Sequence, residues 1–127
     1  LYVADAFGVV QVDLRNHSSH EVDAGPSNTL AGADGLYWYR NSLVAIQNSF
    51  GLPRVAQFRL SPDGRRVTAT TILEFRTPFV ALPTTGAIDG SQLYFMSNTQ
   101  VDNFRDEKIV DPTKLEPVRI SAVPLQN

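Results

Sequence analysis

One short pattern recurs three times along this chain, and it restricts the fold more than any other feature. Each copy is a run of apolar residues that ends in a polar amide or acid. The copies begin at Leu1, Leu43 and Leu93, so their starts lie 42 and 50 residues apart. Repeats of about this length are typical of β-propeller blades, each of which is a four-stranded antiparallel sheet. The repeat therefore predicts an all-β protein built from sheets of one kind.

The middle repeat predicts a complete blade between residues 32 and 75. Its strands are expected at 36–39, 43–47, 54–60 and 67–73. Turn-forming residues separate these strands, above all the run Ser61-Pro62-Asp63-Gly64, in which proline presets φ and glycine accepts a positive φ.

The flanking repeats predict incomplete blades. Blade one, residues 1–25, has expected strands at 1–4, 9–14 and 21–23 and lacks an inner strand. Blade three, residues 84–125, has expected strands at 86–88, 93–97 and 117–123, with a polar insertion at 98–114, and it lacks a fourth strand. The chain is thus expected to begin inside a blade and to be a β-propeller fragment of about two and a half to three blades.

Composition excludes several function classes. The chain has no cysteine, so thiolate metal sites, disulfides and a cysteine nucleophile are ruled out. Its net charge of −2 comes from interspersed acids and bases, and neither a nucleic acid nor a membrane is expected as a partner. No apolar run approaches the roughly 20 residues of a spanning helix, and the first residues lack the features of a signal peptide. The compartment stays open, with a periplasmic or secreted parent protein among the options.

Alternating strand direction places the longer loops on one face of the predicted blades. These loops, which are rich in amides, acids and aromatic residues, span 5–7, 28–34, 48–52, 83–85 and 98–114. Longer loops on a rigid scaffold commonly carry binding sites, so a ligand site is expected on this loop face. The expected ligand-binding residues are Asn48, Asn98, Thr84 and Thr85.

Asp34 is the residue that we expect to carry chemistry. It precedes Gly35 where a loop enters the inner strand of the middle blade, and its carboxylate is expected to point into the central channel. Carboxylate and amide oxygens suit Ca²⁺ or another divalent cation, which makes Asp34 the candidate metal ligand and catalytic residue. An Asp-Gly pair also suits an ordinary turn, as do Asn48 and Asn98, and these alternatives stay open.

Other conspicuous residues favour structural interpretations. His17 and His20 fall near a turn on the opposite face and are expected to be surface residues. Trp38 and Tyr39 are expected in the core between blades. The charged segment 102–108 is either a lid over the channel or an insertion without that role.

Two stretches, taken in order, resemble the SMP-30/gluconolactonase family of six-bladed β-propellers, which is related to strictosidine-synthase-like and paraoxonase-like proteins. They are 1–14, which opens with Leu1-Tyr2-Val3-Ala4-Asp5, and 33–64, which runs from Ala33-Asp34-Gly35-Leu36 to Ser61-Pro62-Asp63-Gly64. The resemblance implies half of a six-bladed ring, its C-terminal half. Either missing N-terminal blades or a second copy in a homodimer would complete the ring.

The resemblance further implies a hydrolase of lactones or esters that uses a divalent cation, usually Ca²⁺, to polarise the carbonyl and activate water. Asp34 matches the family's Asp-Gly position. Thr84 and Thr85 hold the equivalent place in blade three, where neutral hydroxyls are poorer cation ligands. The blades that carry the family's other ligands are not in this sequence, so only part of a site is expected here. The alternative is a non-catalytic module that binds a protein or small ligand through the loop face.

Overall fold

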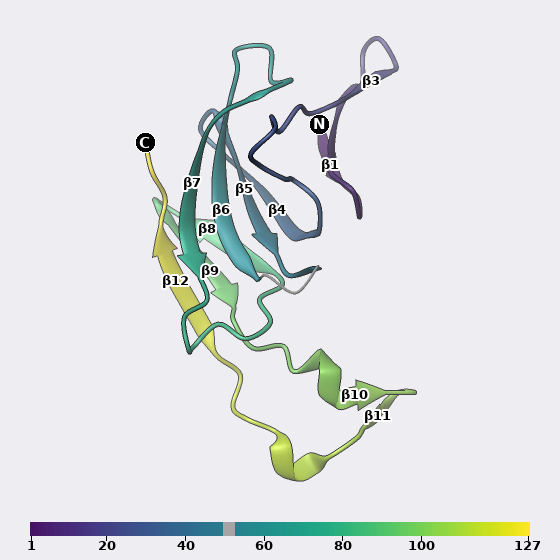
Figure 1. Cartoon of the computed structure of the whole chain (residues 1–127), viewed down its shortest axis with the longest axis vertical. Helices are drawn as coiled ribbons and strands as arrows, with labels where there is room; N and C mark the ends of the chain where they lie inside the picture. Colours follow the sequence, from purple (N-terminus) through teal and green to yellow (C-terminus); the bar gives the residue numbers. More distant parts are fainter. Residues whose placement is uncertain (50–52) are drawn as a thin grey trace.

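The computed structural model describes residues 1–49 and 53–127 and shows an all-β protein (Figure 1). Its strands form four sheets, with neighbouring strands antiparallel throughout, and none of the sheets is closed. Part of the predicted loop 48–52, namely residues 50–52, lies outside the described residues. Among the described residues, no helix has both the length and the apolar character needed to cross a membrane.

The central sheet corresponds to the middle repeat. It contains β4 (Ala33–Tyr39), β5 (Ser42–Gln47), β6 (Arg54–Leu60) and β7 (Val67–Phe75), in that order across the sheet. The limits predicted for β6 are confirmed. The predicted first and last strands are too short, because β4 already begins at Ala33 and β7 continues to Phe75.

The first outer sheet contains β1 (Tyr2–Ala4), β2 (Val9–Asp13) and β3 (Ser18–Glu21). The predicted position of the third strand, 21–23, is wrong. The Asp13 side chain accepts hydrogen bonds from the backbone N–H groups of the next turn, and His17 has a left-handed φ of 51°. The turn is therefore complete at His17, and Ser18 already pairs with Asp13.

The second outer sheet has the order β12-β9-β8, with β8 at Gly86–Asp89, β9 at Gln92–Met96 and β12 at Ile120–Pro124. The predicted start of the last strand, residue 117, is three residues too early, because side-chain amides engage the backbone of 116–119.

A projecting segment, residues 99–118, connects β9 to β12, and we call it the arm (Figure 1). It contains two short 3₁₀ helices and a two-stranded ladder, and none of the residues of either helix is buried. In chain order these elements are η2 (Val101–Asn103), β10 (Phe104–Arg105), β11 (Lys108–Ile109) and η3 (Pro112–Lys114).

The central sheet is buried on both faces by two hydrophobic clusters. The cluster on one face joins Leu43 and Phe58 to Val9 of the first outer sheet. The cluster on the other face joins Ile46 to Phe95 of the second outer sheet. All residues of β5 are buried, which explains why its sequence is a nearly continuous apolar run.

The predicted core position is confirmed for Tyr39 and wrong for Trp38, which is 53% exposed. Trp38 lies on β4, an edge strand of the central sheet, and stacks on Tyr2. His17 and His20 are both exposed, as predicted.

Candidate functional site

The predicted loop face brings several loops together at one end of the sheets. The N–H of Gly32 donates to the carbonyl of Ala6, and the N–H of Asn48 donates to the carbonyl of Gly32. A bridge between Leu82 and Asn98 joins two further loops. Together with the hydrogen bond from the Asn48 amide to the carbonyl of Pro83, these contacts place the segments that contain Asp34, Asn48, Thr84, Thr85 and Asn98 at the same end.

Asp34 lies in a β-bulge at the start of β4. The pairing of β4 with β5 shifts register between Ala33 and Gly35, which leaves Asp34 as the extra residue. Bulges redirect side chains out of the regular alternation and are common beside functional sites. The Asp34 side chain is exposed, and its Oδ2 accepts a 2.6 Å hydrogen bond from Nδ2 of Asn48.

Asn48 connects Asp34 with the loop of the neighbouring sheet. Its Nδ2 donates both to Asp34 and, at 2.9 Å, to the carbonyl oxygen of Pro83. One side-chain amide thus joins three segments: the start of β4, the end of β5 and the connection that leads to β8.

Thr84 and Thr85 lie beside this contact but are positioned by their backbones. The N–H of Thr84 donates to the carbonyl of Met96, and Thr85 accepts from the N–H of Met96. The carbonyl oxygen of Thr84 also approaches β4 closely, because a Cβ built on Gly35 would lie 2.8 Å from it. Glycine at 35 therefore allows the loop at Thr84 to approach Asp34.

Among the described residues, several oxygen atoms that could bind a cation lie around Asp34. They are its own carboxylate, Oδ1 of Asn48 and the carbonyls of Pro83 and Thr84. These oxygen atoms are of the kind that a hard cation prefers. They carry one negative charge between them, and they are fewer than the six to eight oxygen ligands that Ca²⁺ takes. Asn48 also turns its nitrogen towards Asp34, so an ion would require that amide to rotate. No group of three or more His, Asp or Glu side chains able to hold a metal occurs within 1–49 and 53–127.

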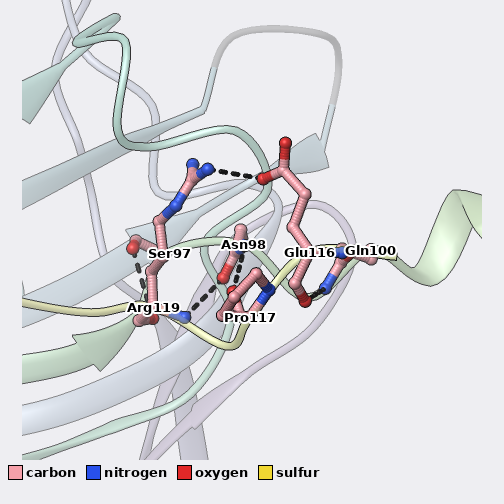
Figure 2. Close-up of polar contacts among 6 residues, drawn as sticks. All are labelled: Ser97, Asn98, Gln100, Glu116, Pro117 and Arg119. Atoms are coloured by element: carbon pink, nitrogen blue, oxygen red, sulfur yellow. Dashed lines mark hydrogen bonds and ion pairs between the residues drawn. The ribbon is translucent and has the colours of Figure 1, made fainter. Parts of the chain in front are cut away.

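Asn98 is placed differently from the other predicted ligand-binding residues. Its side chain is 3% exposed, and its amide donates to the carbonyl of Pro117 and accepts from the N–H of Arg119 (Figure 2). Both ends of the amide therefore fasten the base of the arm. Its role in ligand binding stays a prediction.

Two more amides repeat this arrangement farther along the arm. Gln100 bridges the N–H and the carbonyl of Glu116, and Asn103 bridges the N–H and the carbonyl of Asp111 (Figure 2 shows the first of these). Asp111 also caps η3, and its hydrogen bonds from the hydroxyl and N–H of Thr113 lower the pKa of its carboxyl. We call this series of three amide bridges the amide ladder. Sequence reasoning missed it, although Asn98, Gln100 and Asn103 at the start of a polar insertion were a signal for it.

The arm should loosen when its first amide is removed. In Asn98→Ala, we expect amide hydrogen exchange of 99–118 to accelerate about tenfold or more, because two backbone groups lose their partners at about 1–3 kcal/mol each. Exchange measured by mass spectrometry should remain unchanged in β4 to β7. Asn16→Ala, at an exposed turn distant in sequence, is the matched control. Unchanged exchange in the arm would contradict a fastening role for Asn98.

Comparisons with known protein families, with curated proteins and with solved structures find no match to this chain.

Proposed function

We propose that the loop end around Asp34 is part of a divalent-cation site, with Ca²⁺ the preferred ion, in a hydrolase of lactones or esters. The observation that carries the proposal is the meeting of the Asp34 carboxylate, the Asn48 amide and the Pro83 carbonyl from three separate segments. The reaction class rests on the resemblance of 1–14 and 33–64 to the SMP-30/gluconolactonase family. A divalent cation bound there would polarise the substrate carbonyl and lower the pKa of a bound water.

Within this proposal the chain's own residues have distinct tasks. The bulge takes Asp34 out of the regular pairing of β4 with β5, and its side chain stays exposed. Asn48 orients that carboxylate, and rotation of its amide would present an oxygen in place of the nitrogen. Thr84 and Thr85 would border the bound substrate.

The same proposal treats the three larger sheets as consecutive β-propeller blades, 1–25, 32–75 and 84–125, of a six-bladed ring. In its support, β1, β5 and β9 arise from the three copies of the repeat, and the central sheet packs on both neighbours. Apolar residues on the outer sheets stay exposed, among them Val3 and Ile120. Further blades or a second copy of the chain would cover them.

Asp34→Asn should weaken cation binding about tenfold or more, because a hard cation loses the one carboxylate of the site. The probe is Tb³⁺, whose luminescence can be excited through Tyr37, since the Tyr37 hydroxyl is close to Gly35. Wild type should give a saturable signal that Ca²⁺ displaces. Asp63→Asn, in the turn between β6 and β7, is the control and should bind as wild type does. Equal affinity in wild type and Asp34→Asn would refute the site.

Hydrolysis is tested separately, with γ- and δ-lactones and phenyl esters, in Ca²⁺ and in excess chelator. Activity that needs the cation and falls in Asp34→Asn supports the proposal. Cation binding without hydrolysis of any of these substrates would reject the hydrolase assignment and keep the cation site.

One observation favours the alternative, a non-catalytic module that binds a protein or small ligand. The arm carries a groove of about 360 Å³ whose lining includes the apolar side chains of Val101, Phe104, Ile109 and Leu115. Exposed apolar residues on a fastened projection are typical of interaction surfaces. Deleting the arm should abolish partner binding under this alternative.

A further inference from the structure

A pocket of about 480 Å³ lies between the loop that joins β1 to β2 and the connection that leads from β3 to β4. All of its lining residues fall within 7–30. Two of them, Val22 and Leu30, are 4% and 2% exposed and belong to the cluster between the first outer sheet and the central sheet. The pocket therefore opens from the interface between two sheets that are both present in this chain, and its floor is apolar.

Hydrogen bonds fix both walls of this pocket. In the first wall, Oδ1 of Asp5 accepts from the N–H of Phe7 at 2.8 Å and from the N–H of Gly8 at 2.9 Å, which closes the turn. In the second wall, the carbonyl of Thr29 accepts from Nη2 of Arg54 at 3.0 Å. Because these contacts hold the walls without a ligand, the pocket is preformed, and binding requires little further ordering of the chain.

An acidic and an aromatic side chain stand together at this pocket. The Glu21 carboxylate lies beside Gly8, because a Cβ built on Gly8 would be 3.8 Å from Oε1 of Glu21. Phe7, the residue before Gly8, also lines the pocket, and it is 85% exposed. Within residues 1–49 and 53–127, Glu21 forms no ion pair, whereas Oδ2 of Asp23 lies 3.9 Å from Nε of Arg66. Glu21 is thus the carboxylate of the pocket that is left for a ligand.

We propose that this pocket binds a small organic cation, namely an ammonium group attached to an apolar body. The ammonium group donates to the Glu21 carboxylate and lies against the Phe7 ring, and the apolar body reaches the floor at Val22 and Leu30. Charge complementarity identifies the ligand, because the charged residues of the lining, Glu21 and Asp23, are both acidic. An anion would be repelled, and a neutral molecule would leave Glu21 without a partner. The proposal is independent of the proposed divalent-cation site.

The probe is phenethylammonium, titrated into isotope-labelled protein and followed by nuclear magnetic resonance. Chelator is present throughout, so divalent cations play no part. The backbone N–H signals of Gly8 and Gly25, which line the pocket, should shift in a saturable way, and that of Gly90, between β8 and β9, should not. Phenethyl alcohol has the same carbon skeleton without the charge and should bind at least about threefold more weakly. Hydrocinnamate, an anion of similar size, should give no saturable shift.

In the protein, Glu21→Gln removes the charge and keeps the shape of the side chain, so it should weaken phenethylammonium binding at least about threefold. Glu107→Gln, which changes an exposed acid of the arm, is the matched control and should bind as wild type does. Phe7→Ala should weaken binding by a similar factor, with Phe79→Ala, also exposed, as its control. Both pocket residues are exposed, so the variants should fold, and the dispersion of their spectra verifies this.

Three results would overturn the proposal: no saturable shift of Gly8 and Gly25 in folded wild type, equal affinity for phenethylammonium and phenethyl alcohol, or equal affinity of wild type and Glu21→Gln for phenethylammonium. Equal affinity for the charged and the neutral ligand would mean that the pocket takes apolar molecules regardless of charge, and the assignment of a cation would be wrong.

Discussion

Phe58→Ala should lower the free energy of unfolding by about 3–5 kcal/mol, the usual range for truncating a fully buried phenylalanine. The Phe58 side chain on β6 is 0% exposed and packs in the cluster that contains Val9 and Leu43. Urea unfolding followed by far-ultraviolet circular dichroism measures the loss.

Phe79→Ala is the matched control, because this phenylalanine is 68% exposed and its truncation should change stability by about 0.5 kcal/mol or less. The loss in Phe58→Ala should also be local. Hydrogen exchange should rise more in β1 to β3 than in β8, β9 and β12, because Phe58 contacts the first cluster. A loss below about 1 kcal/mol would show that this core is loosely packed.

Gly86→Ala should be the second most damaging change, at about 1–3 kcal/mol or more. A Cβ on Gly86 would lie 2.2 Å from the carbonyl oxygen of Tyr94 and 3.0 Å from the Cα of Phe95. These are backbone atoms of β9, so a side-chain rotation cannot relieve the contact. The strand β8 must move, and its hydrogen bond to Tyr37 is then lost.

Gly8→Ala separates this effect from the general cost of adding a methyl group. The nearest atom to a Cβ at Gly8 is a side-chain oxygen of Glu21 at 3.8 Å, so the substitution should be nearly neutral. Thermal unfolding of the two variants gives the comparison, and hydrogen exchange of β8 should report the displacement in Gly86→Ala. Equal melting temperatures would contradict the close packing of β8 on β9.

Much of the fold could be predicted because strand positions follow from local patterns. The limits of β6 follow from alternating residues between strong turn formers. The predictions were wrong where contacts with other residues determine a strand limit or the exposure of a side chain. Trp38 is a large aromatic residue of the kind that usually packs in a core, yet it lies on an edge strand and is half-exposed. The start of β3 depended on the Asp13 side chain, which completes its turn early.

The sequence predicted at which end of the sheets the candidate site lies, but it predicted only some of the contacts within that site. Loop order placed Asp34 and Asn48 at one end, but their direct hydrogen bond depends on the bulge at Asp34. For Asn98, the sequence suggested either a turn or a ligand. The partners of its amide, Pro117 and Arg119, are about twenty residues later in the chain, and no local pattern identifies them.

The amide ladder also makes the arm separable from the sheet that carries it. The N–H of Ser97 donates to the carbonyl of Arg119, so the two ends of the arm are already neighbours within the sheet. Closing a connection between paired residues costs entropy that grows only slowly with its length. The arm can therefore be shortened, lengthened or exchanged during evolution while β9 and β12 keep their register.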